Sequence, residues 1–146
     1  MELGKEKIFN EAFSEKGLGN VVLWDVQNIQ DEQLVKISFV SKTSPYRQGV
    51  WLRTDKGIEI PALKSEVYKS ISLWEDTSPE EVIIKCHTSD GKLSVYNIWD
   101  EGEGRESQAD SSGMLILEKE GLLVYKCNAY GFETEFNDLI FSIEKL

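Results

Sequence analysis

The feature of the sequence that most constrains its fold is a regular alternation of apolar and polar side chains in short segments. In residues 34–40, Val, Ile and Phe occupy positions 35, 37 and 39, and in residues 138–144, Leu, Phe and Ile occupy positions 139, 141 and 143. Neighbouring side chains of a strand point to opposite faces of a sheet, so a period of two is typical of half-buried antiparallel strands. No alternation of helices with strands accompanies the pattern, which therefore predicts an all-β fold.

Turns rich in Gly, Asp, Ser and Pro separate ten predicted strands. These are Val21–Val26, Leu34–Val40, Gly49–Thr54, Ile58–Ile60, Val67–Trp74, Glu81–His87, Lys92–Trp99, Met114–Lys119, Leu122–Asn128 and Asp138–Glu144. About nine to ten short strands at this spacing indicate an antiparallel β-sandwich of jelly-roll-like type. A closed barrel is the alternative, because its strands show the same alternation.

Three of the turns predict β-hairpins, because each contains a glycine that can adopt the positive φ of a tight reversal. They lie at residues 54–57, 89–91 and 120–121. A chain of this length is ordinary for one domain, so we expect a single β-sandwich domain over residues 1–146.

The N-terminal residues 1–19 predict a short helix, because their apolar side chains fall on one helical face and glycines follow. The segment lacks the apolar core that a secretory signal needs, so we expect a cytoplasmic protein. Cys86 and Cys127 each lie within an apolar strand, which favours two buried free thiols over a disulfide scaffold, although a bridge between them stays open.

The charge of the chain excludes several classes of partner. With 16 Lys and Arg residues against 26 Asp and Glu, the net charge is −10. Nucleic acids and anionic membrane surfaces are recognised by basic side chains, so we expect the protein to bind neither. No apolar run approaches the length of about 18 residues that a membrane-spanning helix needs.

The excess negative charge is confined to one half of the sequence. Residues 74–146 carry sixteen acidic and six basic side chains, whereas residues 1–73 carry ten of each. The longest segment without a strand pattern, Asp100–Gly113, is densely acidic, and a loop of such length in a compact domain is usually functional or disordered. The residues expected to bind a ligand there are Asp100, Glu101, Glu103, Arg105 and Asp110, next to Trp99.

No arrangement of residues typical of a catalytic site is present. His87, the single histidine, directly follows Cys86, and adjacent side chains of a strand point to opposite faces, so the two cannot form a nucleophile–base pair. A hydrolase built on a pair of carboxylates, from residues 101 or 103 and 133 or 135, stays open. We nevertheless expect a protein that is not an enzyme.

Calcium is the best-motivated candidate ion, because it is bound by carboxylate and amide oxygens from loops at strand ends. Such oxygens occur in the acidic loop at residue 100 and again just before the last predicted strand. The candidate metal ligands of this second segment are Glu133, Glu135, Asn137 and Asp138. In the structural alternative, Asn137 and Asp138 use their side chains to tie the loop to its own backbone.

The segment Glu133–Phe141 resembles the ending D-x-D-[FY]-N-D-[LMV]-[IV]-F of some β-sandwich domains in bacterial surface and secreted proteins. The resemblance covers about ten residues, and it implies calcium or glycan binding. Phe136, Asn137 and Asp138 match the pattern, whereas Glu133 and Glu135 stand where the pattern has aspartates.

Trp99 ends a predicted strand directly before the acidic loop. An exposed Trp beside carboxylates is a common platform for a sugar ring, whereas in the structural alternative the ring is the edge of the core. We therefore expect a non-catalytic binding module for a glycan or another polar ligand, aided by calcium but with no required cofactor. The alternative is a small acidic protein that masks a basic protein partner, such as an immunity protein against a nuclease toxin.

Overall fold

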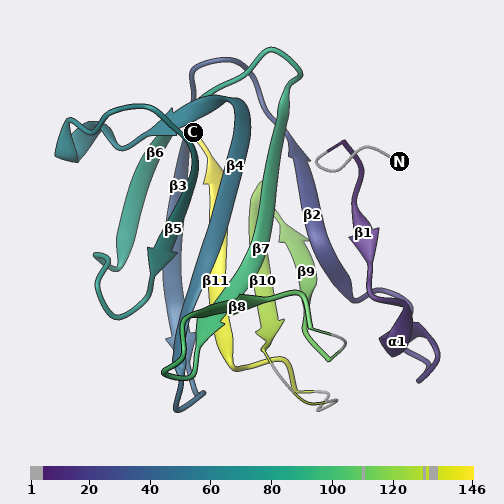
Figure 1. Cartoon of the computed structure of the whole chain (residues 1–146). Coiled ribbons are helices and arrows are strands. Elements are labelled where there is room, and N and C mark those ends of the chain that lie inside the picture. The colour runs from purple at the N-terminus through teal and green to yellow at the C-terminus, as the bar shows by residue number, and fades with distance from the viewer. Residues whose placement is uncertain (1–4, 110, 130, 132–134) are drawn as a thin grey trace.

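A computed structural model of the chain describes residues 5–109, 111–129, 131 and 135–146. Eleven strands lie within these residues (Figure 1). They are β1 (Ile8–Phe9), β2 (Val22–Asn28), β3 (Gln33–Lys42), β4 (Arg47–Glu59), β5 (Tyr68–Trp74), β6 (Glu81–His87), β7 (Lys92–Asp100), β8 (Arg105–Ser107), β9 (Gly113–Lys119), β10 (Leu122–Asn128) and β11 (Leu139–Lys145). Eight of the predicted strands are confirmed, with ends shifted by at most two residues.

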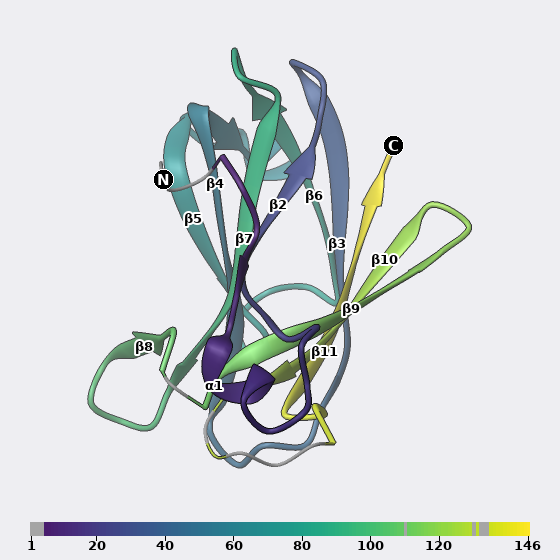
Figure 2. The same ribbon diagram turned by 90° about the vertical axis from the view of Figure 1, so that its right-hand side faces the viewer.

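Eight strands close into an antiparallel barrel in the order β2-β9-β10-β11-β3-β6-β4-β7, and β7 pairs with β2 to complete the ring (Figures 1 and 2). The other three strands extend the ring, since β1 pairs with β2, β5 with β4 and β8 with β7. The all-β fold is thus confirmed, and the barrel replaces the expected sandwich. The apolar–polar alternation of the strands is the same in a sandwich and in a barrel. Closure depends on strand pairings such as β2–β7, which this sequence pattern does not reveal.

Strand β4 closes the barrel because it changes partners along its length. Residues 47–53 pair with β7 and 57–59 pair with β6. Between them lie residues 54–57, here called the β4 corner, where the hydroxyl of Thr54 accepts a hydrogen bond from the backbone NH of Gly57 at 2.8 Å. Gly57 has a φ of +112°, which L side chains rarely adopt. The predicted hairpin at 54–57 is therefore wrong, because the segment is a bend within one strand.

The N-terminal segment is mostly not helical, which corrects a second expectation. Ile8 and Phe9 pair with β2 as strand β1, and only Glu11–Ser14 form a helix, α1, whose first turn is capped by the side chain of Asn10. Pairing with the free edge of β2 thus overrides the helical pattern. No helix in the described part of the chain is long and apolar enough to span a membrane.

The segment expected to be one long irregular loop contains a strand. Residues 105–107 form β8, which pairs with the end of β7 so that Arg105 lies opposite Asp100. The acidic residues between these strands therefore lie on a short hairpin. An intervening stretch of glycines and glutamates has no alternation, so the short strand gave no signal in the sequence.

Apolar side chains from all eight barrel strands fill the core. The rings of Tyr125 and Phe141 stack with centroids 4.7 Å apart. Cys86 and Cys127 are free and buried, and burial raises the pKa of the Cys86 thiol to about 12. Both thiols are therefore protonated and unreactive at neutral pH.

One carboxylate, that of Asp25 on β2, is fully buried. It accepts hydrogen bonds from the hydroxyl of Tyr125 and the amide of Gln27, and the ammonium of Lys7 lies 3.2 Å from its second oxygen. A buried charge is costly unless it is paired, so this contact holds the N-terminal segment against the barrel.

We predict that Gly57→Ala destabilises the protein by about 3 kcal/mol. The positive φ alone costs about 1–3 kcal/mol, and the new Cβ would lie 2.3 Å from a methyl carbon of Val67. Gly121→Ala is the matched control, because Gly121 also has a positive φ of +83° but no neighbouring atom within 4 Å. Urea unfolding followed by tryptophan fluorescence measures the loss of unfolding free energy in both variants. An equal loss in the two would contradict the inference that the β4 corner is crowded.

Candidate functional site

Those expected ligand-binding residues that the structure describes, Trp99, Asp100, Glu101, Glu103 and Arg105, lie at one end of the barrel, on β7, β8 and the turn between them. The Oδ1 atom of Asp100 accepts hydrogen bonds from the backbone NH groups of Gly102 and Gly104 at 2.7 and 3.2 Å, which orient this carboxylate within its own loop. Ligand binding by Asp100 stays a prediction. Glu101 and Glu103 are exposed. Arg105 is also exposed and donates to the hydroxyl of Ser72 at 3.4 Å, while Asp110 lies outside the described residues.

Trp99 is buried, with 2% of its surface exposed, and it lies opposite Gln48 in the β4–β7 ladder. A ring so deeply buried presents no face on which a sugar could stack. The expectation of an exposed platform is therefore wrong, and the alternative that Trp99 belongs to the core holds.

The described segment directly before β11, residues 135–138, lies at the same end of the barrel (Figure 1). Asp138 accepts a hydrogen bond from the backbone NH of Ala129 at 2.9 Å, so its side chain ties the loop to the chain's own backbone. The carbonyl of Asn137 accepts from the hydroxyl of Thr43 at 2.7 Å. Glu135 is exposed, and Glu133 lies outside the described residues.

Within the part of the chain that the structure describes, no three His, Cys, Asp or Glu side chains are arranged to hold a metal ion. Two of the proposed oxygen donors, at positions 110 and 133, are not among those residues. Calcium binding at this end of the barrel stays a prediction.

A polar pocket of about 140 Å³ lies at the opposite end of the barrel, beside the β4 corner, and is here called the corner pocket. Its lining residues are Lys5, Arg53, Thr54, Asp55, Asp90, Lys92 and Ser94. They combine three cationic and two anionic side chains with two hydroxyl groups. None of them is among the residues expected from the sequence to bind a ligand.

The barrel itself positions one wall of the corner pocket. Arg53 on β4 and Ser94 on β7 are direct partners in the antiparallel ladder, so their side chains share one face of the sheet. Lys92 lies two residues before Ser94 and therefore on that same face. Further along the face, the rings of Trp51 and Tyr96 stack with centroids 4.3 Å apart, which fixes the sheet beside the pocket.

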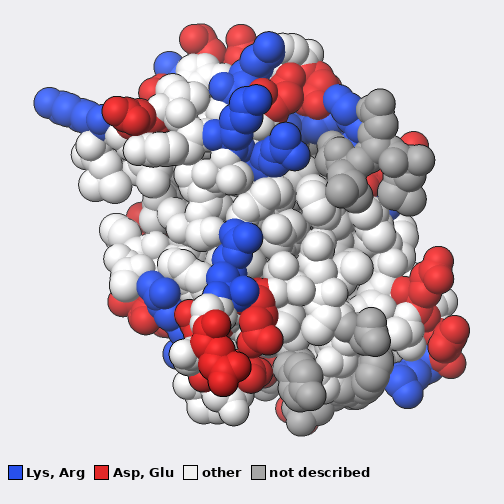
Figure 3. Space-filling model, viewed as in Figure 1, with Lys and Arg blue, Asp and Glu red and all other residues white. Residues whose placement is uncertain are grey.

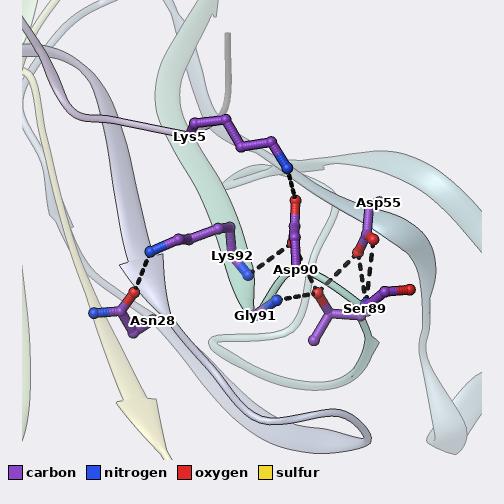
Figure 4. A network of polar contacts seen from close by, with 8 residues as sticks. Lys5, Asn28, Asp55, Ser89, Asp90, Gly91 and Lys92 are labelled. Atoms are coloured by element: carbon purple, nitrogen blue, oxygen red, sulfur yellow. Dashed lines mark hydrogen bonds and ion pairs between the residues drawn. The ribbon is translucent and has the colours of Figure 1, made fainter. Parts of the chain in front are cut away.

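The two aspartates of the pocket, Asp55 and Asp90, lie near each other (Figure 4), and Thr88 joins them. Its hydroxyl lies 2.8 Å from a carboxylate oxygen of Asp55 and 3.0 Å from one of Asp90, and it also accepts from the backbone NH of Gly91 at 2.9 Å. The backbone NH of Ser89 donates to both oxygens of Asp55. These bonds link the β4 corner to the turn between β6 and β7.

Both aspartates are held in the ionised form. Burial alone would raise the pKa of Asp55, but hydrogen bonds from Thr88 and Ser89 outweigh it and hold the pKa below its usual value. Burial acts in the same direction on Asp90, and hydrogen bonds from Lys5, Thr88 and the backbone NH of Lys92 again lower the pKa. The pocket therefore carries two negative charges at neutral pH.

The three cations of the pocket differ in what they already bind. The ammonium of Lys5 lies 2.6 Å from a carboxylate oxygen of Asp90, and that of Lys92 donates to the side-chain carbonyl of Asn28 at 2.7 Å. The guanidinium of Arg53 has no hydrogen-bond or ion-pair partner among the described residues. Arg53 thus offers five donors to a ligand.

Two hydroxyl groups at the pocket have a donor without a described partner, although the Thr54 hydroxyl already accepts from the backbone NH of Gly57. Ser94 is 4% exposed and Thr54 is 2% exposed, and neither hydroxyl donates a hydrogen bond to a described residue. Figure 3 shows the wider charge pattern: Lys and Arg gather over the upper ends of β4 and β7, with Asp and Glu beside them, and further acidic side chains lie near β8. Positive charge is thus concentrated locally on an acidic protein.

No known family model matches the chain, and no curated protein is similar enough in sequence to count as a relative. The chemistry of the pocket is therefore inferred from its own residues.

The sequence contains a weak signal for this pocket. Two turns that each hold an aspartate, at residues 54–57 and 89–91, lie next to the basic residues Arg53 and Lys92. The strand pattern predicts both as hairpin turns, and both predictions are wrong. Residues 54–57 are a bend within β4, and among the described residues β6 and β7 each pair with β4 but not with each other. Nothing in the pattern predicts that the two turns meet. The contact between Asp55 and Thr88 depends on the barrel order, which is a property of the folded chain.

We predict that the aspartates of the pocket stabilise the protein fully above about pH 4, and that this stabilisation is lost progressively as the pH falls below that value. Their folded pKa values lie below the usual value of 3.8, so the stabilisation is present at neutral pH and is lost as pH falls through the folded pKa. An Asp55→Asn/Asp90→Asn variant should therefore lose less stability than the wild type between pH 6 and pH 2.5, as measured by urea unfolding.

The matched control is Glu118→Gln/Glu120→Gln, which removes the same charge from two exposed positions in and after β9. This control should retain the pH dependence of the wild type. If both double variants flatten the pH dependence equally, the effect belongs to net charge and the assignment to Asp55 and Asp90 is wrong.

Proposed function

We propose that the protein is a non-catalytic binding protein that takes up the anionic group of a small polar ligand in the corner pocket. The single observation that carries this proposal is the set of unused donors there. Arg53 and the hydroxyls of Ser94 and Thr54 line one pocket, and none of them donates to a described residue. Guanidinium and hydroxyl donors together are the groups that bind carboxylate and phosphate oxygens in proteins.

The size of the pocket supports a small ligand. Its volume of about 140 Å³ is below the roughly 300 Å³ at which pockets begin to enclose drug-sized molecules. A ligand of a few heavy atoms, or one charged group of a larger molecule, fits such a space. The cations also favour an anion locally, although the whole chain has a net charge of −10.

Binding suits these residues better than catalysis does. The lining includes no histidine and no cysteine. Its carboxylates are held in the ionised form by hydrogen bonds, and proton transfer at neutral pH needs a group whose pKa lies near 7. We therefore assign the pocket a binding role.

The proposed function, binding of a polar ligand, is of the class expected from the sequence. The proposed site lies at the other end of the barrel from the residues expected to form it. Glu101, Glu103 and Glu106 on the β7–β8 hairpin are exposed. A basic protein partner for that acidic surface stays a prediction, and so does glycan binding.

We predict that propionate and inorganic phosphate each bind the wild-type protein in isothermal titration calorimetry at low ionic strength, and that Arg53→Gln weakens both by about tenfold or more. The reason is that a hydrogen bond to a charged group contributes about 1.5–3 kcal/mol. Ser94→Ala, which removes a neutral donor, should weaken binding about threefold to fivefold.

Arg105→Gln is the matched control, because Arg105 is an exposed arginine at the opposite end of the barrel. It removes the same charge and should leave both affinities within about twofold. The proposal is wrong if neither anion binds, or if the two arginine variants weaken binding equally.

A further inference from the structure

We propose that the ligand of the corner pocket is a zwitterion, a small molecule of the amino acid class with a carboxylate at one end and an ammonium at the other. This inference rests on the proposed function and names the ligand class of the same site. Arg53 and the hydroxyls bind the carboxylate, and Asp55 with Asp90 binds the ammonium.

The first support is that Asp55 has spare capacity to accept hydrogen bonds. No ion pair within the described residues involves Asp55. Its Oδ2 atom accepts from the backbone NH of Ser89 at 3.1 Å, and the backbone NH of Asp90 also lowers the pKa of this carboxylate, which has about four acceptor positions in all. The structural bonds to Thr88 and Ser89 orient the carboxylate and leave part of it open.

The second support is the arrangement of the two charge types. In Figure 4, the side chain of Lys92 extends toward Asn28 and away from Asp55, and Asp90 lies between Lys92 and Asp55. Arg53 and Ser94 stand on the sheet wall together with Lys92, whereas Asp55 and Asp90 come from the β4 corner and the β6–β7 turn. The pocket thus has a basic strand wall and an acidic turn wall.

A ligand with a single charge matches only one of these walls. A simple anion gains from Arg53 but nothing from the ionised aspartates, and a simple amine gains from the aspartates but nothing from Arg53. A zwitterion places each end against a wall of opposite charge. If the aspartates served only to join the turns, an added ammonium group would not raise the affinity.

Matched pairs of ligands test this directly. Acetate and glycine, propionate and β-alanine, and butanoate and 4-aminobutanoate differ within each pair only by the ammonium group. In calorimetric titrations of the wild-type protein, we expect the amino member of at least one pair to bind about tenfold tighter than its partner. The length at which the gain is largest reports the distance between the two walls.

Asp55→Asn should remove most of this gain. Asparagine keeps an acceptor oxygen for Ser89, and Asp90→Asn is the second variant if the first does not fold. Asp76→Asn is the matched control, since Asp76 pairs with Arg47, which lies beside Asp100 at the other end of the barrel; it should preserve the gain.

The outcomes separate the two proposals. If simple carboxylates bind but an ammonium group brings no gain in any pair, or if the gain survives in both aspartate variants, the zwitterion inference is wrong and the binding function stands. If neither member of any pair binds, and phosphate does not bind either, both proposals are wrong.

Discussion

The bond network between Asp55 on the β4 corner and Thr88 and Ser89 in the β6–β7 turn is the interaction on which the rest of the structure depends. Closing a sheet into a barrel requires its strands to tilt and stagger, and a bend in one strand helps the sheet to curve. Here β4 bends where its pairing passes from β7 to β6 within thirteen residues. Gly57 permits the bend, and Asp55 fixes it against the neighbouring turn. Closure and the corner pocket therefore have the same origin, because the residues that make the bend also form one wall.

This shared origin explains how an acidic protein can hold a site for an anion. The β4–β7 ladder brings Arg53 and Ser94 together, and the N-terminal segment adds Lys5, which is paired with Asp90. Hydrogen bonds with Thr88 and the neighbouring backbone keep both aspartates ionised and oriented. The structural network thus leaves a preorganised pair of opposite charges at the pocket, and preorganisation lowers the entropic cost of binding a ligand.

Local patterns in the sequence predict most of the strands. The features that these patterns miss depend on contacts between residues that are distant in the sequence. Alternation located β3 and β11 because each buries one face, a property that three or four neighbouring residues reveal. The bend at residues 54–57 has the same composition as a hairpin turn, so its role follows only from which strands flank it. The burial of Trp99 is missed for a related reason. Whether a side chain at the end of a strand is exposed depends on which other segments pack over it, and the strand pattern does not show this. The pocket combines residues from the N-terminal segment, β4, the β6–β7 turn and β7, and their meeting is a consequence of barrel order.

The central claim is that the corner pocket, and not the acidic β7–β8 hairpin, is the binding site. The most direct test is to record ¹H–¹⁵N correlation spectra of the labelled protein during titration with β-alanine at low ionic strength. The account predicts that the largest shifts occur at the backbone amides of Arg53, Asp55, Ser89 and Ser94, and that they saturate with one affinity. Shifts concentrated in residues 101–106 or 135–138, or no saturable shift anywhere, would contradict it.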